Sequence, residues 1–266
     1  MLFVKLNLLL KDKVKFIFSN DLTIYTSIFS KFKYFMCTVT YLPLGNNDFI
    51  LTSNRDEDPN RKTIPPKEYV EDGVKLTYPK DELAGGTWIG LSDKNRLICL
   101  LNGGFTKHKR EESYRMSRGV IVKELLKVDN PIAIINDFDF NGIEPFTIVL
   151  VDWIAELKAY ELVWDGTQKH FQEIGEQPKI WSSSTLYTDD VKQLRREWFA
   201  EWIEENPKFS QNKIVEFHQN ETKGNPEVSL KMKRSRVETV SVTSVRKYNQ
   251  ELQLSYLDFV NQPLVK

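Results

Sequence analysis

From position 37 onward, the alternation of apolar and polar residues predicts a chain rich in antiparallel β-strands. The segments CTVTYLP (37–43) and DFILTSN (48–54) alternate as half-buried strands do, and the turn sequence LGNN separates them. This order is typical of a β-hairpin and places Cys37 at the start of its first strand. The other expected strands are GGTWIGLS (85–92), NRLICLL (95–101), FTIVLVDW (146–153), LKAYELVW (157–164), KIWSSS (179–184), VETVSVTSV (237–245) and ELQLSYLDFV (251–260).

Four segments follow the helical period instead. They are YRMSRGVIVKELLKV (114–128), PIAIINDF (131–138) with proline in its first turn, a long segment from Thr188 to Glu205, and SQNKIVEFHQ (210–219). Thr188 suits the N-cap of the long helix, and two aspartates follow it in the first turn. Strand pairs precede and follow helix pairs without strict alternation. The pattern therefore favours an α+β fold with layers built around antiparallel sheets.

Residues 1–35 differ in composition from the rest of the chain. They are rich in Phe, Leu, Ile, Lys and Asn, contain neither Arg nor Gly, and match neither a signal peptide nor a mitochondrial presequence. We therefore expect residues 1–36 to be an upstream extension, through a start assigned too far upstream, with an atypical targeting segment as the alternative. Residues 37–266 are expected to form a single domain. If Met36 initiates the chain and is removed, Cys37 becomes the first residue.

Charge and cysteine content exclude several classes of partner. Lys plus Arg (37) equals Asp plus Glu (37), so the chain has no global field to recruit nucleic acid or an anionic membrane. No apolar run is long enough for stable membrane insertion. The two cysteines cannot form a disulfide framework, which favours a reducing, cytoplasmic location. The three histidines are far apart and none lies near a cysteine, so we expect no metal and no resident cofactor.

The candidate catalytic residues are Cys37 and members of the segment NRDE (54–57). In an antiparallel hairpin the start of the first strand lies beside the end of the second, so Arg55 and Asp56 are expected to flank the thiol. An N-terminal α-amine can accept the thiol proton near neutral pH, while a nearby cation favours the thiolate. Asp56 would orient the ammonium and Arg55 would bias the charge. The alternative interpretation is a buried strand cysteine beside a solvated turn with an ion pair.

Four motifs in order resemble the signatures of the NRDE protein family, also called the transport and Golgi organisation protein 2 family. They are MCTVTYLP, SNRDEDPNRKTIPP, AGGTWIGLSDKNRLICLLN and SRGVIVKELL. The resemblance implies a four-layer αββα sandwich like that of the N-terminal nucleophile hydrolases. It also implies that Cys37 is the nucleophile, that Arg55 and Asp56 support it, and that the chain starts at Met36.

The same resemblance extends the candidate site beyond the hairpin. Asn102, in LLNGGF, is the expected oxyanion donor, with a strand-end turn residue as the alternative interpretation. Asn54 and a buried Trp88 are expected at the substrate. The sequence departs from the family at Ser183, where an asparagine is expected, and near its end, where an arginine is absent. Arg236 is the nearby candidate to replace that arginine.

Two functions follow from these residues. The first is a cysteine amidohydrolase that acts on a small or lipid-like amide through a thioester at Cys37. The second is a non-catalytic carrier of haem or lipid, as members of the family have been linked to haem trafficking, lipid handling and Golgi organisation. In a haem carrier Cys37 would be an axial thiolate ligand or a structural residue.

Overall fold

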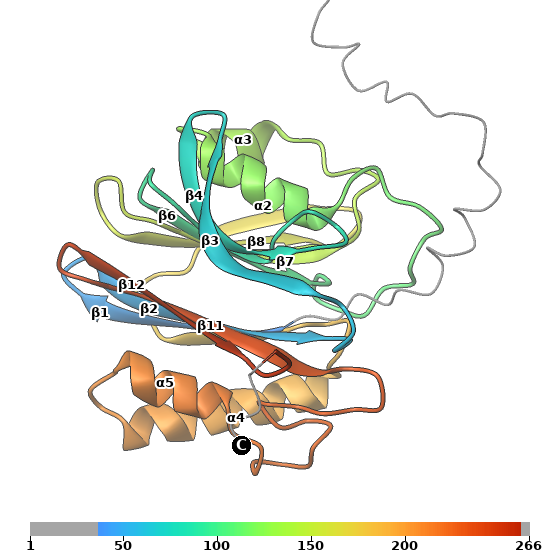
Figure 1. Cartoon of the computed structure of the whole chain (residues 1–266), viewed down its shortest axis with the longest axis vertical. Helices are drawn as coiled ribbons and strands as arrows, with labels where there is room; N and C mark the ends of the chain where they lie inside the picture. The colour runs from blue at the N-terminus through green and yellow to red at the C-terminus, as the bar shows by residue number, and fades with distance from the viewer. Residues whose placement is uncertain (1–36, 262–266) are drawn as a thin grey trace, which may run out of the picture. The chain divides into compact units, whose positions relative to one another are not determined.

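The computed structural model describes residues 37–261, and in it two antiparallel sheets face each other between two pairs of helices (Figure 1). The predictions for residues 1–36 lie outside the described residues. The five-stranded sheet has the order β10-β1-β2-β11-β12, and the seven-stranded sheet has the order β3-β4-β5-β6-β7-β8-β9. The architecture is the αββα sandwich expected from the sequence.

The strands and helices alternate in blocks along the chain rather than one by one. Their bounds are β1 Thr38–Gly45, β2 Asp48–Glu57, β3 Thr63–Glu71, β4 Val74–Asp81, β5 Ile89–Ser92, β6 Arg96–Asn102, α2 Arg118–Lys127, α3 Pro131–Asp137, β7 Phe146–Asp152, β8 Lys158–Trp164, β9 Lys169–Glu173, β10 Lys179–Ser182, α4 Asp189–Glu205, α5 Gln211–His218, β11 Glu238–Tyr248 and β12 Glu251–Asp258.

The first hairpin has the geometry that its sequence predicts. Asn46 and Asn47 both have positive φ, 51° and 62°, which suits the tight turn between β1 and β2. Val39 pairs with Ser53 and Tyr41 pairs with Leu51, so the register is set by buried residues on the same face. Cys37 immediately precedes β1 instead of forming its first residue.

Three strands have no counterpart in the expectations from sequence, namely β3, β4 and β9. Strands β3 and β9 are the two edges of the seven-stranded sheet, where many side chains are polar and only partly buried. Pro65 and Pro66 lie where the register of β3 against β4 shifts, and prolines are tolerated at such irregular edge positions. Weak apolar alternation at the edges therefore hid β3 and β9. Strand β4 lies inside the sheet with Val74, Leu76 and Tyr78 buried, so its alternation was a signal that was overlooked.

Each sheet is covered on its outer face by one helix pair (Figure 1). Helix α2 packs on β4, β5 and β6 of the seven-stranded sheet, while α4 contacts β10 and α5 contacts β2 and β11 of the five-stranded sheet. Helix α4 begins after Thr188 as predicted, although the Thr188 side chain makes no capping hydrogen bond. Its apolar stripe packs toward the sheet, with Trp198, Phe199 and Trp202 buried.

A buried ion cluster joins the two sheets. One guanidinium nitrogen of Arg55 on β2 lies 2.9 Å from the carboxylate of Asp81 on β4, and Arg61 approaches the same carboxylate at 2.6 Å. The Arg55 guanidinium also lies over the Trp88 ring, 4.5 Å from its centroid. Burial raises the pKa of the adjacent Glu57 to about 7, against the lowering effect of both arginines. The cluster thus links the sheets through one shared carboxylate.

The Asp81 charge is expected to be essential for stability. Asp81→Asn keeps the shape of the side chain and leaves two arginines without their nearest buried counter-charge, so it should lower the free energy of unfolding by about 3 kcal/mol. Urea denaturation measures the loss. The matched control is Glu68→Gln, because Glu68 pairs with Lys75 at 3.9 Å on the exposed surface and should contribute less than about 1 kcal/mol. Equal losses in the two variants would contradict this account of the cluster.

Candidate functional site

Cys37 lies at the point where β1 meets its two neighbours, β2 and β10. Its side chain is fully buried and belongs to the core between the sheets, together with Trp88 and Cys99. The Cys37 carbonyl accepts a hydrogen bond of 3.1 Å from the backbone N–H of Ser183. Continuing the β1–β2 register from Val39 and Ser53 by two residues places Cys37 across from Arg55. The hairpin therefore brings the cysteine and the NRDE segment side by side.

Arg55 and Asp56 point to opposite faces of β2, as adjacent strand residues do. Arg55 enters the space between the sheets, where Asp81 and Trp88 hold it. The Asp56 carboxylate instead accepts hydrogen bonds from Tyr187 (3.0 Å) and Thr239 (2.7 Å). Only Arg55 therefore shares the face on which the Cys37 side chain packs.

The surroundings of Cys37 favour the thiol over the thiolate. Burial raises the pKa of Cys37 well above 9.0, and the nearby charge of Asp56 adds to this effect. A hydrogen bond from the Asp56 backbone and the positive charge of Arg55 both lower the pKa, but they do not offset burial. Arg55 lowers the pKa of Cys37, as expected, but its effect is smaller than that of burial. A separate base is needed to activate this sulfur.

The Asn102 side chain is a conspicuous buried polar group on β6, the strand that Ser183 connects to Cys37. It is fully buried at the end of β6, and within residues 37–261 neither its amide nitrogen nor its amide oxygen has a hydrogen-bond partner. Trp88 Nε1 and Arg55 Nε, also buried, lack partners in the same part of the chain. Unpaired buried groups are costly, and functional sites are where such costs are found. Of these unpaired donors, Trp88 Nε1 and Arg55 Nε lie together in the core between the sheets.

Ser183 connects Cys37 to Asn102. Its backbone N–H donates to the Cys37 carbonyl, while its hydroxyl donates to the backbone carbonyl of Asn102 at 2.6 Å and lies 2.9 Å from the Thr185 hydroxyl. The serine at this position therefore serves as a bridge between β1 and β6. Because its hydroxyl is already engaged, it is a poor replacement for the amide donor of an asparagine.

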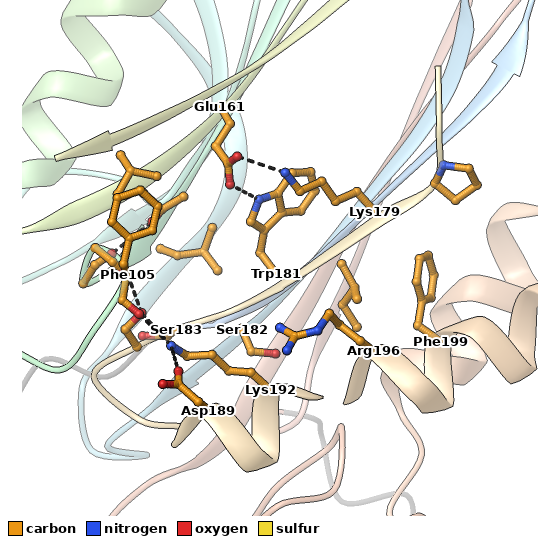
Figure 2. Close-up of a pocket in the computed structure, with 18 of the residues that line it drawn as sticks. Phe105, Glu161, Lys179, Trp181, Ser182, Ser183, Asp189, Lys192, Arg196 and Phe199 are labelled. Atoms are coloured by element: carbon orange, nitrogen blue, oxygen red, sulfur yellow. Dashed lines mark hydrogen bonds and ion pairs between the residues drawn. The ribbon is translucent and has the colours of Figure 1, made fainter. Parts of the chain in front are cut away.

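A cavity of about 540 Å³ adjoins this bridge (Figure 2). Ser183 and Leu101 form part of its wall, and further lining residues come from β7, β8, β10, α4 and the segment from Gly103 to Phe105. Glu161 on this wall accepts hydrogen bonds from Trp181 Nε1 at 2.6 Å and Lys179 Nζ at 2.9 Å. Cys37 does not line the cavity, so the bridging serine segment separates the thiol from it.

Two residues predicted at the substrate have surroundings that the sequence did not indicate. Asn54 faces the helix layer, where its amide nitrogen donates to the carbonyls of His218 and Leu230 and its amide oxygen contacts the His218 ring. The amide therefore anchors α5 and the following loop to β2. Arg236 is exposed, and Arg234, two residues earlier, is the arginine that reaches Leu186 and the Tyr187 ring. Of the two arginines in this loop, Arg234 is therefore the one that turns toward the protein interior.

Sequence reasoning missed the residues that hold Asp56. Tyr187 and Thr239 bond its carboxylate, and the Arg195 guanidinium lies 3.7 Å from the centroid of the Tyr187 ring. Burial raises the pKa of Asp56, and Arg195 is the strongest influence in the opposite direction. Arg195 follows Val191 by four residues and precedes Phe199 by four. The sequence did hold a signal for Arg195, because a charged residue within the apolar stripe of α4 indicates a buried partner.

The described residues contain neither a cluster of metal-binding side chains nor a helix suited to span a membrane. No group of three or more His, Cys, Asp or Glu side chains within residues 37–261 is arranged to hold a metal ion. His218 is buried, and both of its ring nitrogens contact other side chains, those of Thr40 and Asn54. In that same region no helix has the length and apolar character required to cross a membrane.

The fold resembles that of solved N-terminal nucleophile hydrolases. An N-acylethanolamine-hydrolyzing acid amidase (NAAA) ortholog from Caenorhabditis elegans has a TM-score of 0.57 and 12% identity, over 78% of this chain and 92% of that chain. Two variants of conjugated bile acid hydrolase from Clostridium perfringens have TM-scores of 0.47 and 0.45 with 10% and 11% identity. Those two matches cover 85% and 86% of this chain and 94% of each relative.

No curated protein matches the chain by sequence. The sequence profile of one family does match, from residue 36 to residue 256, and this range begins at Met36 and includes every strand and helix up to β12. The chain belongs to the Transport and Golgi organisation 2 family.

Proposed function

We propose that this protein is a cysteine amidohydrolase of the N-terminal nucleophile type, acting on a small or lipid-like amide. The observation that carries the proposal is the buried side-chain amide of Asn102, which has no hydrogen-bond partner among residues 37–261. Ser183 links the backbone of Asn102 to that of Cys37. The family match that begins at Met36 and the amidase-like fold support it. The fold neighbour from C. elegans is named for hydrolysis of N-acylethanolamines, which are lipid amides.

The chemistry needs Cys37 as the first residue. Its α-amine has an ordinary pKa of about 7.7 to 8.0 and takes the thiol proton. The sulfur then attacks the amide carbon, the amine leaves with a proton, and water hydrolyses the thioester. The Asn102 amide nitrogen supplies the hydrogen bond for the oxyanion. Asp56 orients the ammonium, and Arg55 is a positioning residue held by Asp81.

A haem or lipid carrier is the second candidate function. Its support is the position of the cavity, which has a volume of about 540 Å³ and is not lined by Cys37. A pocket of this size falls within the range of about 300–1,000 Å³ that is usual for small ligands. In the carrier the thiol is a packed core residue, in line with its full burial. For either function we propose the cytoplasm, because both cysteines of the chain are free thiols.

Acylation of Cys37 tests the enzyme directly. Protein expressed from Met36, with the methionine removed, should form a covalent acyl adduct with an activated ester, because the free α-amine activates the sulfur. Cys37→Ser should lose the adduct, while Cys99→Ser should retain it because Cys99 lies within β6 and has no free α-amine to activate it. Intact mass spectrometry follows both. An unmodified protein that binds haem and never acylates would defeat the enzyme and leave the carrier.

The role of Asn102 makes a separate prediction. Asn102→Ala removes the side-chain donor for the oxyanion, so the acylation rate constant should fall roughly a hundred- to a thousandfold with little change in ester binding. Stopped-flow release of the leaving group measures both quantities. Asn54→Ala is the matched control. It removes an equally buried amide that lies on the helix-facing side of β2, away from the Arg55 side chain, and it should lower stability more than it lowers the rate of acylation. Equal rate losses in both variants would remove Asn102 from the site.

A further inference from the structure

The cavity beside Ser183 carries one more positive charge than it can neutralise. Five charged side chains line it, and four of them form two ion pairs. Glu161 pairs with Lys179 at 2.9 Å, and Asp189 pairs with Lys192 at 3.0 Å. The fifth is Arg196, which has no carboxylate partner among residues 37–261. The net charge of the wall is therefore positive, and its source is one residue.

The Arg196 guanidinium is positioned to bind an anion. Its only hydrogen bonds to described residues go to the neutral side-chain oxygen of Gln193, at 3.0 Å and 2.7 Å, one turn earlier on α4. Figure 2 shows the side chain extending from α4 toward Ser182 at the end of β10. The bonds to Gln193 hold the guanidinium plane while some of its N–H donors remain available. A planar fork of this kind recognises carboxylates well.

The rest of the wall is mainly apolar. Side chains from both sheets and from α4 contribute: Leu101, Val163, Ile180, Trp181, Phe199 and Ile203. Phe105, 53% exposed, stands at the cavity, and its backbone carbonyl accepts a hydrogen bond of 2.9 Å from Lys192. An apolar surface with a single charged group at one side suits a ligand with the complementary pattern.

We infer that this cavity binds a molecule with an apolar body and a carboxylate group, and that Arg196 is the residue that selects the carboxylate. The inference goes beyond the proposed amidohydrolase, because Cys37 does not line this cavity. The carboxylate lies at Arg196 and the apolar body lies against Leu101 and Val163. Binding itself needs no reaction at the thiol, so the two proposals can fail separately.

The test is equilibrium binding of two probes of equal chain length, decanoate and decan-1-ol, to the full chain by calorimetry. The unmodified protein should bind decanoate roughly tenfold more tightly than decan-1-ol, because only the carboxylate can form a hydrogen-bonded ion pair with Arg196, whose exposure to solvent weakens that pair. Arg196→Gln should abolish this preference and leave decan-1-ol binding unchanged. Arg196→Lys should retain part of it.

Two further variants place the binding in this cavity. Ala200→Trp fills space on the α4 side of the wall, where Ala200 is exposed, and should weaken both probes. Lys213→Gln removes an exposed positive charge from α5, outside the cavity, and should change neither. An unchanged preference for decanoate in Arg196→Gln, or equal binding of both probes by the unmodified protein, would overturn the inference. Acylation of Cys37 by an activated ester is read separately and bears only on the proposed function.

Discussion

The buried ion pair between Arg55 on β2 and Asp81 on β4 is the contact on which the site depends. It joins the two sheets at the end of the hairpin that carries Cys37, and the Trp88 ring lies against the same guanidinium. Burying an arginine is costly unless its charge is matched at close range, which is why Asp81 and the second arginine, Arg61, are held so near. The distance between the sheets at Cys37 is thus set by electrostatics as well as by packing.

Strand alternation then divides the polar residues of β2 between two tasks. Arg55 turns into the inter-sheet core, whereas Asn54 and Asp56 turn toward the helix layer, where Asn54 binds α5 and Asp56 is held by Tyr187 and Thr239. A single four-residue segment therefore fastens the five-stranded sheet to both of its neighbouring layers. The thiol lies in this junction, and its burial raises its pKa. In the proposed mechanism the α-amine of Cys37 takes the proton that this buried thiol retains.

Much of the fold could be predicted because its buried strands alternate or run apolar, and because the turn between β1 and β2 carries two asparagines. The edge strands β3 and β9 could not, since their half-exposed side chains weaken the pattern. Cys37 and Arg55 could be paired from hairpin register alone. The alternation of side chains along β2 also predicts that Asn54 faces away from Arg55, toward the helix layer. This was overlooked because residues 54–57 were treated as one cluster. Within the described part of the chain the Asn102 amide has no hydrogen-bond partner, and this depends on neighbours from distant strands, which a single sequence does not reveal.

The pH dependence of thiol alkylation tests the central claim most directly, since it reports which base activates Cys37. In a Cys99→Ala background, protein that begins at Cys37 should react with iodoacetamide with a midpoint near the α-amine pKa of about 8. The full chain, in which Cys37 has no free amine, should stay unreactive until well above pH 9, because burial raises its thiol pKa above the ordinary 9.0. Identical profiles for the two proteins would contradict the α-amine mechanism.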